Sequence, residues 1–185
     1  MMVRSTAEIL VFIAFIGAQT VAGQSWMTQT GTVEFISSVP FFTFTGTSQH
    51  LTGVINLADS TVDFYVDLST LKTGIGKRDK DMRLSLDIKE YPFAEFYGKL
   101  ITDFDRSIPD GQAAMVEGVF TLHGVKKNVR LSGVLQLIGD QLVLDAGWDL
   151  NLEDYNIVPP KLLIVKVDEI QKIRITAALD PMNSQ

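Results

Sequence analysis

Residues 116–137 read VEGVFTLHGVKKNVRLSGVLQL, with apolar and polar side chains alternating on both sides of a central His123-Gly124 pair. A period of two is typical of a β-strand with one face buried and one face in water. The inward row of the first half holds Val116, Gly118, Phe120 and Leu122. The inward row of the second half holds Val129, Leu131, Gly133, Leu135 and Leu137. The short Gly-containing segment between the halves predicts a β-hairpin.

The same alternation continues on both sides of this hairpin. It is clearest in Thr61–Leu68, where Val62, Phe64 and Val66 share a face with Leu68. Two further rows, 142–150 and 173–179, follow the hairpin toward the C-terminus. Less regular segments at 32–39, 41–57 and 94–102 bring the expected number to about eight strands. Short turns at 138–141 and 109–111 join neighbouring strands, so we expect an all-β up-and-down barrel or a sandwich.

Two segments depart from the strand pattern. In the charged segment Arg78–Lys89, Met82 and Leu86 are spaced as on one face of a helix. We expect a short helix near 79–86, which ends before Pro92 because the residue before a proline disfavours the helical region. The segment 152–167 contains Pro159-Pro160, which a central strand does not accommodate. It is either part of the mouth of the fold or a continuing strand.

The N-terminus has the layout of a secretory signal peptide. Arg4 precedes an apolar run from Ile9 to Ala18, and the small residues Val21-Ala22-Gly23 follow. The run is shorter than the roughly 20 residues that a membrane-spanning helix needs. We therefore expect residues 1–23 to be a cleaved leader and residues 24–185 to be one exported domain, periplasmic or secreted. An uncleaved N-terminal anchor is the alternative.

Composition excludes several functional classes. The 16 Lys+Arg residues against 22 Asp+Glu give a net charge of -6, which disfavours binding to nucleic acid. No cysteine is present, so disulfides, thiolate metal sites and cysteine nucleophiles are ruled out. Carboxylates at 79, 81 and 87 lie among Lys and Arg residues, and we interpret them as surface ion pairs and predict no metal site.

The sequence contains no recognisable catalytic motif. His50 and His123 are the two histidines, and neither accompanies a G-x-S-x-G nucleophile motif. We interpret His123 as a turn residue whose ring hydrogen-bonds nearby backbone. His50 is interpreted as a loop residue within Gly46–Gly53. We therefore predict no catalytic residue.

The inward rows contain aromatic side chains beside small ones. A barrel of eight strands either fills its interior with side chains or holds one small ligand. Glycines in the rows could leave space for a chain-like ligand, or could interlock with the large side chains. Composition alone leaves a packed core and a lined cavity as alternatives.

Two spaced motifs carry a resemblance to a known family. The first is Leu122–Val129, LHGVKKNV, which follows VEGVFT at 116–121. The second is Arg78–Arg83, RDKDMR, followed by Lys89–Phe96, KEYPFAEF. In sequence, order and separation they resemble the motifs of the YceI-like family of exported polyisoprenoid-binding proteins. The resemblance covers nearly the whole chain after the leader.

This resemblance implies a lipocalin-like, eight-stranded antiparallel barrel around an elongated apolar cavity. It favours the cavity over the packed core and implies a long isoprenoid or fatty-acyl lipid as ligand, held for transport, storage or sequestration. No cofactor other than such a lipid is implied. Transient contact with a membrane is compatible with it, and the oligomeric state stays open. A non-binding structural or interaction module of the envelope is the alternative, and an enzyme that acts on a bound lipid is the least favoured one.

Candidate site residues follow from the inward rows and from the charged segment. The predicted cavity lining is Phe35, Phe42, Phe44, Phe64, Val66, Phe96, Phe120, Leu131, Leu144 and Trp148. Arg78 and Arg83 are candidates for contact with an anionic headgroup. The sequence departs from the family in two places: segment 31–37 lacks the family's histidine, and Asp81 stands where the second motif has one. A headgroup contact of other members therefore does not carry over.

Overall fold

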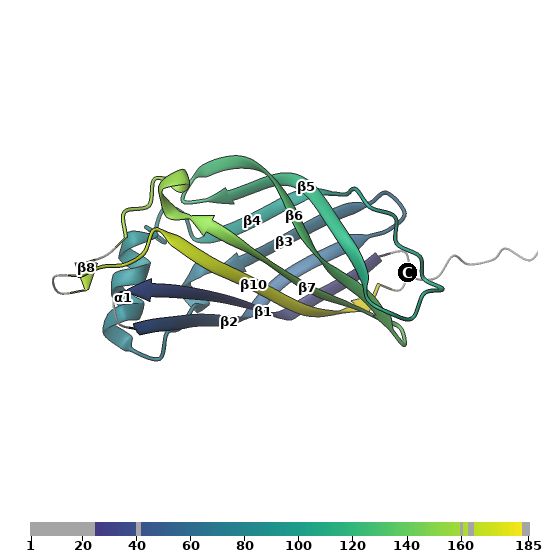
Figure 1. Ribbon diagram of the computed structural model, residues 1–185, viewed down its shortest axis with the longest axis horizontal. Helices are drawn as coiled ribbons and strands as arrows, with labels where there is room; N and C mark the ends of the chain where they lie inside the picture. Colours follow the sequence, from purple (N-terminus) through teal and green to yellow (C-terminus); the bar gives the residue numbers. More distant parts are fainter. Residues whose placement is uncertain (1–24, 40–41, 160, 163–164, 183–185) are drawn as a thin grey trace, which may run out of the picture.

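The strands of the protein form a closed antiparallel barrel. The computed structural model describes residues 25–39, 42–159, 161–162 and 165–182, so the expected leader lies outside the described residues. The barrel strands are β1 (Ser25–Val39), β2 (Phe42–Asn56), β3 (Thr61–Asp67), β4 (Phe93–Leu100), β5 (Gln112–Leu122), β6 (Val125–Ile138), β7 (Gln141–Asn151) and β10 (Ile170–Pro181). Each pairs with its neighbours in the order β1-β10-β7-β6-β5-β4-β3-β2, and β2 pairs back to β1. The predicted eight-stranded up-and-down barrel is confirmed (Figure 1).

The alternation of side chains decides which face of each strand is buried. In β3, Val62, Phe64 and Val66 are buried, whereas Asp63 and Tyr65 are exposed. The inward row continues on the neighbouring strands, because Phe64 pairs with Phe96 on β4 and Phe96 pairs with Phe120 on β5. Aromatic residues from strands that are distant in the sequence therefore meet on one inner surface.

Turn residues have the backbone conformations that tight hairpins require. His123 and Gly124, between β5 and β6, both have positive φ, at 52° and 72°. Two consecutive residues with positive φ are typical of the type I′ turn, which matches the twist of paired strands. Gly139, between β6 and β7, also has a positive φ of 60°.

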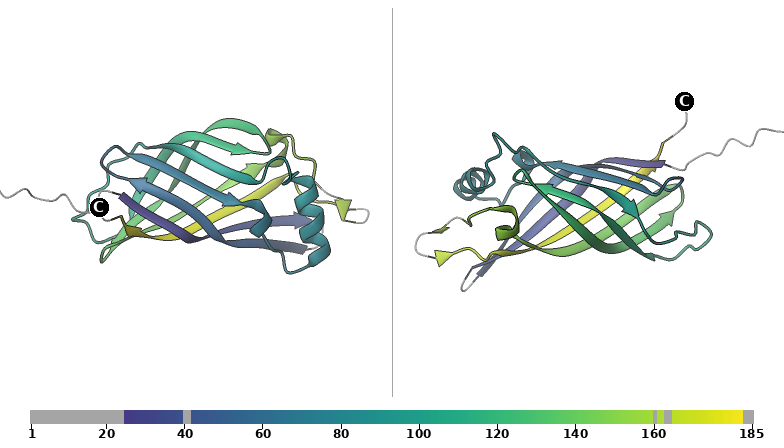
Figure 2. Two further views of the ribbon diagram at one scale, coloured as in Figure 1. Left: turned by 180° about the vertical axis from the view of Figure 1, so that it is seen from behind. Right: turned by 90° about the horizontal axis from the view of Figure 1, so that it is seen from above.

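Short elements cluster at one end of the barrel. Helix α1 (Gly76–Ser85) lies there, as do the short helix η2 (Leu152–Tyr155) and the two-stranded hairpin of β8 (Lys161–Leu162) and β9 (Val165–Lys166). The short helix η1 (Leu68–Thr70) follows β3. The predicted helix is confirmed. It begins three residues earlier than expected, directly after its N-cap residue Ile75. Figure 2 shows the same arrangement from behind and from above.

The opposite end of the barrel is closed by a tight apolar cluster around Trp26. Its members, each at most 2% exposed, are Trp26, Ile55, Leu135, Leu142 and Leu179. The Trp26 indole Nε1 donates a hydrogen bond of 2.9 Å to the Asp140 carbonyl oxygen. The Arg106 guanidinium lies 5.2 Å from the centroid of the Trp26 ring. This end is therefore sealed by packed side chains.

No helix among the described residues is long and apolar enough to cross a lipid bilayer.

Candidate ligand-binding cavity

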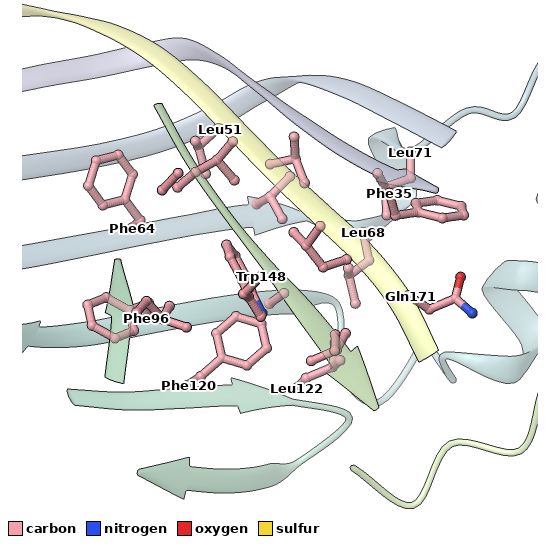
Figure 3. A pocket seen from close by; sticks show the side chains of 18 of the residues that line it. Phe35, Leu51, Phe64, Leu68, Leu71, Phe96, Phe120, Leu122, Trp148 and Gln171 are labelled. Atoms are coloured by element: carbon pink, nitrogen blue, oxygen red, sulfur yellow. The ribbon is translucent and has the colours of Figure 1, made fainter. Parts of the chain in front are cut away.

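The barrel encloses an apolar cavity of about 230 Å³. This exceeds the roughly 150 Å³ of an engineered apolar cavity that stays dry and binds benzene. Side chains project into it from strands on several sides, as the labelled Phe64, Phe96, Phe120 and Trp148 show in Figure 3. Such a space, apolar on nearly every side, favours a hydrocarbon over a polar ligand.

Most of the predicted lining residues surround this cavity. They are Phe35, Phe44, Phe64, Val66, Phe96, Phe120, Leu131, Leu144 and Trp148. Phe42 lies outside the lining and is 52% exposed. Strand phase places Phe42 and Phe44 on the same face, but Phe42 is the first residue of β2, where the strand has already passed the end of the cavity.

Glycines on the wall give the aromatic rings room to lie flat. A Cβ atom at Gly53 would overlap the ring of Phe64, and one at Gly46 would overlap the ring of Phe35. A Cβ at Gly98 would come within 2.8 Å of Cζ of Phe96. The glycines thus interlock with the large side chains and draw the rings against the wall. The centre of the barrel stays open as a consequence.

An aromatic cluster joins the wall to the covered end. The Phe120 ring meets the rings of Trp148 and Tyr155 edge to face, with centroids 6.0 and 5.6 Å apart. Tyr155 belongs to η2, and burial raises the pKa of its hydroxyl above the usual value of 10.0. The cluster therefore holds η2 against the end of the cavity.

Helix α1 and the segment after η2 cover the cavity at this end. Met82 of α1 and Leu86, the residue that caps the C-terminus of α1, line it, together with Ile157 and Val167 from the irregular segment 152–167. That segment therefore forms part of the cavity's end, and its described residues add no strand to the barrel. Residues 163 and 164 of its apolar run lie outside the described residues.

The two headgroup candidates lie in different places. Arg78 lines the cavity, and its guanidinium carbon is 4.1 Å from the centroid of the Phe44 ring. Asp81, which also lines the cavity, forms a 3.0 Å ion pair with Lys77. Arg83 is not part of the lining, and its Nε is buried with no hydrogen-bond partner among the described residues. Helical geometry explains the difference, since positions five apart on one helix point in different directions.

Asp79 anchors α1 to the preceding loop. Its Oδ1 accepts hydrogen bonds from Oγ1 and from the backbone N–H of Thr73, at 2.6 and 2.7 Å. The hydroxyl bond is the main reason why the pKa of Asp79 lies below its usual value of 3.8. Among the described residues, no group of three or more His, Asp or Glu side chains could hold a metal ion.

Neither histidine lies in the lining formed by the described residues. His123 Nδ1 is 3.0 Å from the Tyr155 carbonyl oxygen, as expected for a ring bonded to nearby backbone, and its ring packs on Tyr91. His50 is exposed, and it lies within β2 rather than in a loop. The Gly46–Gly53 segment belongs to β2 because β1 pairs with it on both sides of His50, with a shift in register between Ser48 and Leu51.

Two buried polar side chains that sequence reasoning missed also line the cavity. Ser37 of β1 is 1% exposed and Gln171 of β10 is 5% exposed. Strand alternation could have predicted both positions. Ser37 continues the inward row of Val33 and Phe35, and Gln171 stands two residues before Ile173 in the inward row of β10. Both are polar where the rest of the row is apolar.

Comparisons with known proteins agree with this architecture. A family model described as the YceI-like domain matches residues 26–179. A solved polyisoprenoid binding domain from Saccharophagus degradans, implicated in plant cell wall breakdown, aligns with a TM-score of 0.72 at 16% identity, covering 86% of this chain and 99% of that chain. BcnA of Burkholderia cenocepacia aligns with a TM-score of 0.66 at 14% identity, covering 79% of this chain and 94% of that chain.

The YceI protein of Campylobacter jejuni aligns with a TM-score of 0.54 at 12% identity, covering 100% of this chain and 99% of that chain. At these identities the structural likeness shows a shared fold. Among curated protein sequences, none matches this chain.

Proposed function

The chain belongs to the YceI-like family, and from that premise we propose that it is an exported binding protein that holds one long-chain apolar lipid in the barrel cavity. The ligand is an isoprenoid or an acyl chain, and the protein carries, stores or sequesters it without catalysing a reaction on it. The observation that carries this proposal is the apolar cavity of about 230 Å³ that aromatic and aliphatic side chains line from several strands. The structural neighbour named as a polyisoprenoid binding domain supports the choice of ligand class.

The energetics of such a site depend on the apolar surface that the ligand buries. Each methylene group removed from water contributes about 0.8 kcal/mol. About ten buried carbons would give about 8 kcal/mol, which corresponds to a dissociation constant of about 1 μM before the costs of association. Binding of useful strength therefore needs no ion pair.

Export rests on the N-terminal sequence. Arg4, the apolar run and the small residues at 21–23 support a signal peptide whose removal leaves the barrel domain in the periplasm or outside the cell. N-terminal sequencing of the mature protein tests this. A first residue at or near Gln24 supports export, and an intact Met1 contradicts cleavage.

The binding proposal is tested by fluorescence. The chain has two tryptophans, and Trp148 lines the cavity whereas Trp26 lies in the sealed end. In a Trp26→Phe variant, titration with an isoprenoid or a fatty acid should change Trp148 emission in a saturable way. A Trp148→Phe variant, which keeps only the distant indole, should show little change. A flat titration in the first variant with every chain tested would refute lipid binding.

A further inference from the structure

Within the apolar cavity, one hydroxyl lacks the partner that buried polar groups normally have. Ser37 Oγ is buried and has no hydrogen-bond partner among the described residues. Ser37 pairs with Phe44 across the β1–β2 ladder and lines the cavity beside it. Because burial of an unpaired hydroxyl is unfavourable, such a group in a binding cavity marks a position where a ligand atom supplies the bond.

Gln171 presents a second free hydrogen-bonding atom to the same place. Its Nε2 donates a 2.6 Å hydrogen bond to the Asp168 carbonyl oxygen, which fixes the orientation of the amide. Its Oε1 takes part in none of the hydrogen bonds among the described residues. Figure 3 shows the Gln171 side chain at the α1 end of the cavity, away from the aromatic side chains around Phe96.

Both side chains lie where the pairing of β1 with β10 ends. Ile36 and Lys172 form the last pair of this ladder, and Ser37 and Gln171 are the residues next to that pair on the two strands. Both side chains line the cavity. A ligand group at this end of the cavity can therefore contact both.

The chemistry of this pair selects a particular ligand group. Gln171 Oε1 can only accept a hydrogen bond, whereas the Ser37 hydroxyl can donate one or accept one. A hydroxyl group of the ligand satisfies both, because it donates to Gln171 and accepts from Ser37. A phosphate or carboxylate would instead place an anionic oxygen against Gln171 Oε1.

Charge around the pair also disfavours an anion. Arg78 is the cationic side chain among the described lining residues, and its guanidinium already lies over the Phe44 ring. Asp81 from the same helix turn also lines the cavity and is the ion-pair partner of Lys77. The two cationic side chains nearest this place, Arg78 and Lys77, therefore already have partners within the protein, and an anion would have to compete with those partners.

We propose that Ser37 and Gln171 form a polar subsite that recognises the terminal hydroxyl of a long-chain alcohol whose hydrocarbon chain lies along the aromatic wall. This rests on the proposed function, since it names the polar end of the ligand that the cavity holds. Ser37 and Gln171 determine selectivity among long chains, and the wall supplies the bulk of the binding.

Three probes of one chain length test the subsite: geranylgeraniol, the hydrocarbon in which its hydroxyl is replaced by hydrogen, and geranylgeranyl monophosphate. Dissociation constants are measured by Trp148 fluorescence on the intact protein. The wild type should bind the alcohol about tenfold more tightly than the hydrocarbon, as expected for two hydrogen bonds to otherwise unpaired groups. It should also bind the alcohol more tightly than the phosphate.

Variants assign this preference to the pair. Ser37→Ala and Gln171→Met should each reduce the preference for the alcohol to about threefold or less and leave the hydrocarbon affinity nearly unchanged. Ser38→Ala, one residue along β1 with its side chain on the opposite face, is the matched control and should keep the full preference. Two variants are used so that a folding defect in one does not decide the result.

Each outcome separates the subsite from the lipid-binding proposal. Equal affinity of the wild type for alcohol and hydrocarbon overturns the subsite while lipid binding stands. An unchanged preference in both variants, or tighter binding of the phosphate, also overturns it. Failure of all three probes to bind overturns the lipid-binding proposal itself.

Discussion

Replacement of Ala146 by leucine separates a ligand cavity from an incompletely packed core. Ala146 of β7 is half-buried, lines the cavity, and lies between Gly133 on β6 and Ile175 on β10. Gly133 has no side chain, so the added carbons have space beside the wall. The leucine side chain therefore extends into the open interior.

The expected magnitudes follow from the cavity. A cavity of about 230 Å³ costs about 5.5 kcal/mol when empty, at about 24 cal/mol per Å³. Leucine adds about three carbons, which recover up to about 2.4 kcal/mol of this at about 0.8 kcal/mol each. The empty protein should therefore become more stable, with a melting temperature higher by about 5–10 °C. The ligand loses the same space, so its affinity should fall by up to about 50-fold.

Two measurements on the same variant test this: thermal unfolding without ligand, and titration with geranylgeraniol followed by Trp148 fluorescence. Val143→Leu, on the outer face of the same strand, is the control and should alter neither quantity much. Loss of about 1–3 kcal/mol of stability with unchanged ligand affinity is the result for an overfilled core, and it would refute the cavity. Gly118 is a poorer position for this test, because a Cβ there would overlap the Tyr97 carbonyl oxygen in the wall.

Three further predictions concern single side chains. Ser37→Ala should stabilise the empty protein by about 1–3 kcal/mol because it removes an unpaired buried hydroxyl, and a lower melting temperature would show that the hydroxyl has a partner. Asp79 has a lowered pKa, so its contribution to stability is complete above pH 3.8 and is lost as the pH falls through the lower value of the folded state. Thr73→Val should move that pKa, followed by carboxyl NMR, back toward 3.8, and an unchanged value would contradict the role of the Thr73 hydroxyl. Trp26→Ala should destabilise the sealed end by about 3–5 kcal/mol in urea unfolding, whereas a loss below about 1 kcal/mol would mean that the indole is not needed there.

The regular strands were predictable because alternation is a local property of the sequence. Segment 61–68 alternates without interruption, and β3 occupies it. The hairpin at His123-Gly124 was predictable for the same reason, since the chemistry of a tight turn resides in its own residues. By contrast, the first half of β1 was missed. Its buried positions include the polar Thr28, and its pairing with β2 shifts register between Thr28 and Gly31.

The site was predictable only in part, because its members depend on contacts between distant segments. The aromatic rows follow from strand phase, but Phe42 shows that phase does not say where a cavity ends. The helical pattern likewise does not show which face of α1 is turned to the cavity, so the sequence could not predict that Arg78 lines the cavity and Arg83 does not. The Ser37–Gln171 pair needs the closure of β1 onto β10, which joins the two ends of the barrel sequence. That closure is a property of the whole fold.

Native mass spectrometry of the mature protein shows directly whether the barrel holds a lipid. The protein is purified without detergent from the cells that naturally make it, and the spectrum is compared before and after extraction with organic solvent. We expect a single long-chain lipid bound to each barrel, released by the solvent, and largely absent from the Ala146→Leu variant. A spectrum that holds the polypeptide mass alone, before extraction and after incubation with a total lipid extract, would contradict it.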